Sequence, residues 1–209
     1  GIVDYKESTK PYGAALPTDK TFWDDLFKES VQWGLYTYEQ DWLHNEFLTL
    51  NSTKSSLTLG RDWLLQMGNA ASKHSLKIQY CMSYPRFVLQ TLEIEPITQI
   101  RVSEDYQPGD WRPNQWSIGD TSLFAYALNL APFKDVFWSS VTEPNNRYNG
   151  TETKPALEGA IATLSTGPVG PGDAIGSMDR DLIMRSCVED GLLLKPSRPL
   201  TTIDEVYKH

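Results

Sequence analysis

The chain has little of what marks a small scaffold held together by disulfides or metal ions. Its 209 residues include two cysteines, Cys81 and Cys187, without C-x-x-C spacing, and three histidines. Two cysteines are too few for a disulfide framework, and these cysteines and histidines do not form a zinc-binding pattern. We therefore expect buried free thiols and no metal site.

Long apolar runs and clusters of basic residues are also missing. No run approaches the ~18 apolar residues that a membrane-spanning helix needs. The first ten residues, GIVDYKESTK, lack the basic and apolar parts of a signal peptide. With 27 acidic against 19 basic residues the net charge is −8, which repels a phosphate backbone. The sequence thus predicts neither a membrane span nor a nucleic-acid partner.

Phosphate-binding loops are absent as well. No G-x-G-x-x-G follows a first strand and no G-x-x-x-x-G-K-[ST] occurs, so a nucleotide-binding fold would lack its usual phosphate loop.

What the chain does contain is an alternation of short apolar runs with amphipathic stretches. The runs predict strands near residues 34–40, 76–82, 98–103, 136–141 and 167–170. Helices are predicted at 21–32, 59–74, 86–94, 119–131, 155–165 and 180–190. This order is typical of parallel strands joined by helical crossovers, in an open doubly wound sheet or a (β/α)8 barrel. Five strands do not close an eight-stranded barrel, so a barrel requires about three more strands.

Two acidic residues stand at the ends of predicted strands, each followed by an aromatic residue: Asp41 in YEQDWL and Asp105 in RVSEDY. Hydrolysis of a glycosidic bond needs two carboxyl groups that face each other across the sugar. Arg101 is placed to bind a sugar hydroxyl or to keep a neighbouring carboxylate ionised. The aromatic residues near these acids suit the apolar face of a sugar, and they are Trp42, Tyr106, Trp111, Trp116 and Trp138.

The same pattern has a purely structural reading, because acids after strands are often helix caps and tryptophans are often in the core.

Five segments in order carry a resemblance to a known family: YEQDWL, CMSYP, RVSEDY, TGPVGPGD and RSCVEDGLLLKPSRPLT. Together they resemble the catalytic barrels of the α-galactosidase and raffinose synthase clan of glycoside hydrolases, from about residue 22 to 202. The resemblance implies a (β/α)8 barrel of which this chain supplies roughly strands four to eight. It implies that Asp41 is the nucleophile and Asp105 the acid/base. It also implies that Arg101, the Cys81 strand and the Asp173 loop line the sugar pocket.

One position departs from the clan. Members usually carry a lysine two residues before the nucleophile, where this chain has Glu39. A carboxylate accepts hydrogen bonds where an ammonium donates them, so Glu39 would contact sugar hydroxyls differently. The resemblance implies an α-galactoside-like substrate, and Glu39 argues against a strict preference for galactose.

Two functions follow as hypotheses. The first is a retaining α-glycosidase or transglycosidase that acts on an oligosaccharide or glycoconjugate through a glycosyl ester of Asp41. It predicts carboxyl groups of Asp41 and Asp105 roughly 5 to 6 Å apart. The second is a carbohydrate-binding or structural extracellular glycoprotein that has the barrel without turnover.

Two N-x-S/T sequons, at Asn51 and Asn149, lie in polar segments and indicate exposed loops of a secreted or lumenal glycoprotein. The missing strands, and an exit segment LLLKPSRPLTTIDEVYKH, lead us to expect that residues 1–209 are a partial barrel and a piece of a longer polypeptide.

Overall fold

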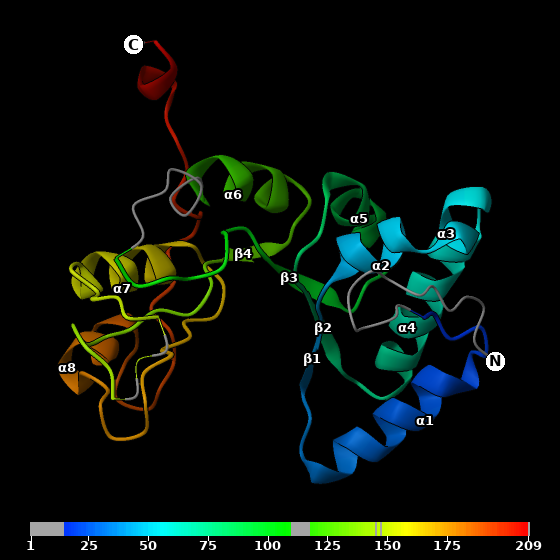
Figure 1. Cartoon of the computed structure of the whole chain (residues 1–209), viewed down its shortest axis with the longest axis horizontal. Helices are drawn as coiled ribbons and strands as arrows, with labels where there is room; N and C mark the ends of the chain where they lie inside the picture. The colour runs from blue at the N-terminus through cyan, green and yellow to red at the C-terminus, as the bar shows by residue number, and fades with distance from the viewer. Residues whose placement is uncertain (1–14, 110–117, 145, 147, 209) are drawn as a thin grey trace. The chain divides into compact units, whose positions relative to one another are not determined.

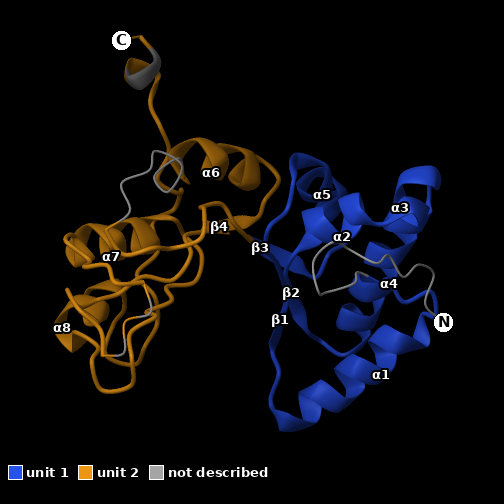
Figure 2. Cartoon of the chain, viewed as in Figure 1, with its two compact units in different colours: residues 1–99 blue, residues 100–209 orange. Residues whose placement is uncertain are grey.

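The computed structural model describes residues 15–109, 118–144, 146 and 148–208. They form an α/β fold with a four-stranded parallel sheet in the order β1-β2-β3-β4 (Figure 1). The strands are β1 (Thr37–Gln40), β2 (Lys77–Tyr80), β3 (Ile97–Arg101) and β4 (Ala131–Phe133). The predicted α/β class and the parallel pairing are confirmed. The chain divides into two compact units, residues 1–99 and 100–209 (Figure 2).

The first unit pairs β1 and β2 in parallel register, with Thr37 opposite Lys77 and Gln40 opposite Tyr80. The pairing of β2 towards β3 starts where the Ile78 N–H donates to the Pro96 carbonyl at 2.8 Å. The helices of this unit are α1 (Thr21–Ser30), α2 (Leu43–Thr49), α3 (Asn51–Ser55), α4 (Leu59–Lys73) and α5 (Pro85–Gln90), with 3-10 turns at Val31–Trp33 and Thr91–Glu93.

The two longest helices of this unit, α1 and α4, pack against each other. Trp23 and Phe27, four residues apart on one face of α1, are buried, as the helical period of the apolar residues predicts. Close packing of α4 requires a glycine at position 68, because a Cβ there would lie 2.2 Å from Cγ2 of Ile94. These contacts hold α1 and α4 in place within the first unit.

The second unit contains the end of β3, then α6 (Ile118–Ala127), β4, α7 (Pro155–Leu164) and α8 (Arg180–Ile183). Two 3-10 segments, Met184–Ser186 and Asp204–Tyr207, follow. Three aromatic residues, Tyr106, Phe137 and Trp138, form a core together with Ala162, and Val169 packs against it.

Two of the five predicted strands are wrong. Residues 136–141 and 167–170 are not strands, and the two segments meet only at an isolated parallel bridge, Phe137 with Pro171. Proline lacks the N–H that a ladder needs, so Pro168 and Pro171 limit any longer pairing there. The fourth strand lies instead at 131–133, because α6 ends at Ala127 and Asn129 adopts a left-handed φ of 60°.

The polar loop predicted around Asn51 is also wrong, since α2 and α3 occupy residues 43–55. Within the described residues every helix is too short or too polar to span a bilayer.

Candidate functional site

Asp41 comes directly after β1, at a backbone position that fixes its carboxylate. Its Oδ1 accepts a hydrogen bond from the Trp42 N–H at 2.7 Å, and Trp42 has a left-handed φ of 66°. Such a φ is uncommon for a residue with a bulky side chain and is held by local contacts. On the strand side, the buried Gln40 donates from Nε2 to the Asp41 carbonyl at 3.0 Å. No described residue forms a hydrogen bond to Oδ2.

Three rings beside Asp41 form what we call the aromatic surface: Trp42, His44 and Tyr84. The Trp42 and His44 rings are near-parallel at 6.5 Å, and the His44 and Tyr84 rings lie 5.2 Å apart. Trp42 is 51% and Tyr84 47% exposed. The carbonyl of Met82 holds His44, accepting from its backbone N–H at 3.1 Å and lying 2.8 Å from its Nδ1. Exposed rings next to a carboxylate suit the apolar face of a sugar.

A second carboxyl in this region escaped the sequence reasoning. Burial, with a smaller contribution from the negative charge of Asp41, raises the pKa of Glu46 to about 7; Glu46 lies in the first turn of α2. Burial also raises the pKa of Tyr38 to about 12, with a smaller contribution from Glu46. Near neutral pH the carboxyl of Glu46 is therefore partly protonated, and the negative charge of Asp41 favours its protonated form. The sequence signal for Glu46 was an acid five residues after Asp41. It was overlooked because this segment was predicted as a loop and not as a helix.

In the second unit, Arg101 forms ion pairs with two carboxylates. Its guanidinium lies 2.7 Å from Asp105 and 3.4 Å from Asp135. Asp135 in turn accepts from the Tyr106 N–H at 2.8 Å, and its own N–H donates to Oγ of Ser103 at 2.9 Å. Asp135 therefore fastens the segment after β3, and the Asp105 side chain, 69% exposed, extends from it.

This arrangement differs from the expected one. The sequence predicted a strand that reaches residue 103, but β3 ends at Arg101. Arg101 and Asp105 meet because the chain turns after the strand. Asp135 carries the same signal as Asp41, an acid just after a strand, and was missed because residues 119–131 had been predicted as helix.

The other predicted site residues fall in different environments. Trp138 is buried in the aromatic core against Tyr106, so its ring offers no open stacking surface. Cys81 is a buried free thiol, as expected, whereas Cys187 is only half-buried. Glu39 is exposed, and no described residue forms an ion pair with it. Trp111 lies outside the described residues.

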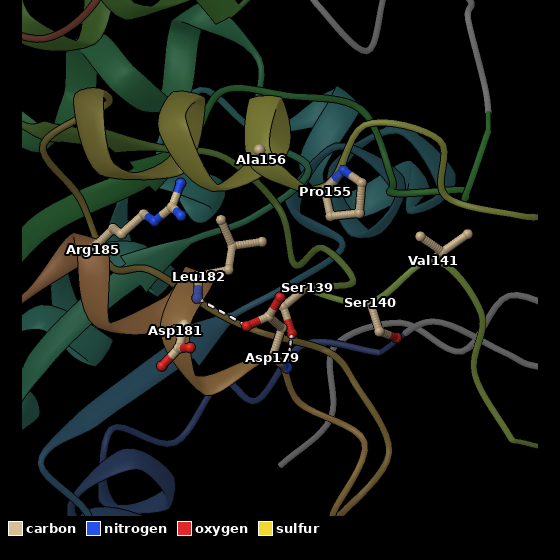
Figure 3. A pocket seen from close by; sticks show the side chains of 9 residues that line it. All are labelled: Ser139, Ser140, Val141, Pro155, Ala156, Asp179, Asp181, Leu182 and Arg185. Carbon is tan, nitrogen blue, oxygen red and sulfur yellow. Dashed lines mark hydrogen bonds between the residues drawn. The ribbon is translucent and has the colours of Figure 1, made fainter.

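Asp173 fixes a loop rather than presenting a free carboxylate. Its Oδ1 accepts from Ser139 N–H at 2.8 Å, from Ser139 Oγ at 2.9 Å and from Ser140 N–H at 3.0 Å, and Oδ2 also faces Ser139 N–H at 3.0 Å. Ser139 Oγ accepts in turn from the Asp179 N–H at 2.8 Å. Ser139 thereby ties three segments together next to a cavity (Figure 3).

Both sequons are exposed, but their local structure differs. Asn149 lies outside helices and strands with a left-handed φ of 51°. Asn51 is the first residue of α3, so the loop predicted for it is wrong while its exposure agrees.

Asp41 belongs to the first unit and Asp105 to the second, so their separation of roughly 5 to 6 Å stays a prediction. Among the residues that the structure describes, no group of three or more His, Cys, Asp or Glu is arranged to hold a metal ion. No protein-family model matches the chain, and no curated protein matches its sequence at a significant level.

Proposed function

We propose that this chain is part of a (β/α)8 barrel and acts as a retaining glycoside hydrolase or transglycosidase on α-glycosides. The observation that carries the proposal is the carboxylate of Asp41, fixed at the end of a parallel strand beside the exposed rings of Trp42 and Tyr84. Catalytic groups of barrel enzymes lie where strands end, and sugars pack their apolar faces on aromatic rings.

The chemistry requires two steps at the anomeric carbon. First, a carboxylate oxygen of Asp41 attacks this carbon, the bond to the leaving oxygen breaks, and Asp105 gives that oxygen its proton. Then Asp105 takes a proton from water or an acceptor hydroxyl, whose oxygen attacks the same carbon and releases Asp41. These steps need no metal or organic cofactor.

The local contacts assign a function to each side chain. Because Trp42 N–H holds Oδ1 of Asp41, the other oxygen is the one that attacks. Arg101, at 2.7 Å, pairs with the ionised form of Asp105, which is the form that takes the proton in the second step, and Asp135 holds the same guanidinium at 3.4 Å. Arg101 is therefore a positioning residue.

Covalent trapping tests the nucleophile. A 2-deoxy-2-fluoro-glycosyl fluoride should add one glycosyl group to the protein, and peptide mass spectrometry should place it on Asp41. Asp41→Asn should abolish the label and lower kcat by at least about 10³-fold. Asp25→Asn, a matched change at an exposed position of α1, is the control. Labelling that persists in Asp41→Asn refutes this assignment.

Leaving-group dependence tests the acid/base. A glycosyl fluoride leaves without protonation, so Asp105→Asn should slow its first step far less than it slows an alkyl glycoside. The neighbouring Glu104→Gln is the control, because Glu104 is exposed and no described side chain pairs with its carboxylate. Equal losses on both substrates contradict acid catalysis by Asp105.

A second candidate is a carbohydrate-binding or structural extracellular glycoprotein without turnover. The aromatic surface favours it, since Trp42 and Tyr84 would bind a sugar whether or not Asp41 attacks it. Oligosaccharide binding that is lost in Trp42→Ala, without any trapped intermediate, would support this function.

Secretion or residence in a lumen is part of both proposals. Exposed side chains at Asn51 and Asn149 support it, because a glycan is attached only where the asparagine is accessible. Release of glycan mass from the natural protein by an N-glycosidase, abolished by Asn51→Gln with Asn149→Gln, is the expected result.

A further inference from the structure

A cavity of about 430 Å³ lies within the second unit, in the part of the chain that follows the aromatic core (Figure 3). Its size falls within the range of about 300 to 1,000 Å³ that is typical of small-molecule sites. Three segments line it: the loop at residues 139–141, the start of α7, and α8 with the turn that follows. The lining residues are Ser139, Ser140, Val141, Pro155, Ala156, Asp179, Asp181, Leu182 and Arg185.

The walls of this cavity are held in place by hydrogen bonds. The carboxylate of Asp173 accepts hydrogen bonds from the backbone N–H groups of Ser139 and Ser140. Asp179 caps α8 by accepting from the Leu182 N–H at 3.0 Å, and its own N–H donates to Ser139 Oγ at 2.8 Å, as the dashed lines in Figure 3 show. The loop and α8 are therefore joined, and a ligand would not have to order them.

Residues that donate and residues that accept hydrogen bonds both line the cavity. Arg185 brings a guanidinium with several N–H donors, and Asp181 brings a carboxylate that only accepts. No described residue forms an ion pair with either side chain. Figure 3 shows Leu182 between Arg185 on one side and Pro155 with Val141 on the other. An apolar wall thus separates the guanidinium from the serine loop.

The charges restrict the class of ligand. Asp179, Asp181 and Arg185 together carry a formal charge of −1, which opposes a phosphate dianion. A purely apolar ligand would remove water from the guanidinium and the carboxylates without replacing its hydrogen bonds, which is costly. A hydroxyl group donates and accepts at once, so neighbouring hydroxyls satisfy Asp181 and Arg185 without added charge.

We infer that this cavity is a binding site for a neutral polyhydroxylated ligand of monosaccharide size, with Arg185 and Asp181 binding its hydroxyls and Leu182 packing on its carbon face. The site uses neither Asp41 nor Asp105. It therefore goes beyond the proposed catalytic function and stands or falls separately from it.

Photolabelling of the whole protein tests this inference. The probe is a methyl α-D-glycopyranoside that carries a diazirine, with unmodified methyl glycosides as competitors. Ligands of this size bind at about millimolar concentration. We expect labelled peptides from residues 139–141 or 179–185, in wild type and in Asp41→Asn alike. Asp181→Asn and Arg185→Gln should each weaken labelling about tenfold, because each removes hydrogen bonds to a charged group.

Arg180→Gln is the matched control, since Arg180 is exposed on α8 and does not line the cavity; it should label like wild type. Labels found only near Asp41 or Asp105 would overturn the inference and leave the proposed function intact. Absence of saturable labelling, or labelling that inorganic phosphate displaces while methyl glycosides do not, would also overturn it. Cavity labelling in a protein that fails to trap a glycosyl intermediate would support the inference and count against the enzyme.

Discussion

The buried ion pair of Lys134 with Glu158 allows a quantitative test of the second unit. Lys134 follows β4 and Glu158 lies in the first turn of α7, and each side chain is 1% exposed, with Nζ 2.5 Å from the carboxylate. Nζ also donates to the carbonyls of Asp135 and Val136, both at 3.3 Å. The ring of Tyr106 lies 5.0 Å from the same nitrogen. The pair therefore joins β4 to α7 in a dry environment.

Removal of Lys134 takes the cation away from a carboxylate in that environment. Lys134→Met should destabilise the protein by about 3 to 5 kcal/mol, because Glu158 then remains buried without its ammonium partner. Lys134→Met with Glu158→Leu should recover most of this loss, since apolar replacement of both partners is often neutral or stabilising. The cycle of four proteins gives the coupling between the two side chains.

Equilibrium unfolding in urea, followed by circular dichroism, measures these differences in the free energy of unfolding. The dependence of this free energy on urea concentration should be the same for all four proteins. For a chain of this length, a loss of about 3 to 5 kcal/mol corresponds to a fall in Tm of roughly 6 to 20 °C. Lys195→Met, at an exposed position, is the control and should change stability by no more than about 0.5 kcal/mol. A Lys134→Met protein within about 1 kcal/mol of wild type would refute the reasoning that the pair is desolvated.

Two further predictions concern the first unit. The pKa of Glu46 is about 7 in the folded chain against an ordinary value of 4.5, so the folded state binds more protons and stability should fall as the pH rises through this window. The free energy of unfolding, measured from pH 5 to 8, should decrease less with pH in Glu46→Gln than in wild type. An equal decrease in both proteins would contradict the raised pKa of Glu46. Gly68→Ala should cost about 1 to 3 kcal/mol, because its Cβ would overlap Ile94. Gly170→Ala, whose Cβ would meet Val136 at an ordinary 3.6 Å, should be nearly neutral in the same unfolding assay.

The sequence predicted those elements whose residues repeat with a clear period. The helices at Thr21–Ser30 and Leu59–Lys73 bury one face each, and that repetition is visible without a structure. The strand at 131–133 has only three residues and directly follows apolar helix residues, so no change of period marks it. The two short helices after Asp41 contain several polar residues, which look like a loop when tertiary contacts are unknown.

For the candidate site, the position of an acid just after a strand could be recognised in the sequence. The residues that each acid contacts could not. Arg101 contacts Asp135 across 34 positions of sequence, and no local pattern encodes a contact of that kind. Trp138 and Trp42 have the same residue type, yet the first is buried in a core and the second exposed. Which tryptophans face solvent depends on packing between distant segments, which periodicity alone does not give.

The hydrogen bond between the Met82 carbonyl and the His44 ring also determines which ring nitrogen of His44 is protonated. A carbonyl oxygen only accepts, so the Nδ1 that lies 2.8 Å from it must bear the proton. In the neutral ring Nε2 then keeps its lone pair, so a single tautomer is selected and the ring has a fixed polarity between Trp42 and Tyr84. The aromatic surface is thus not uniformly apolar, because the Nε2 of His44 adds a hydrogen-bond acceptor to that of the Tyr84 hydroxyl.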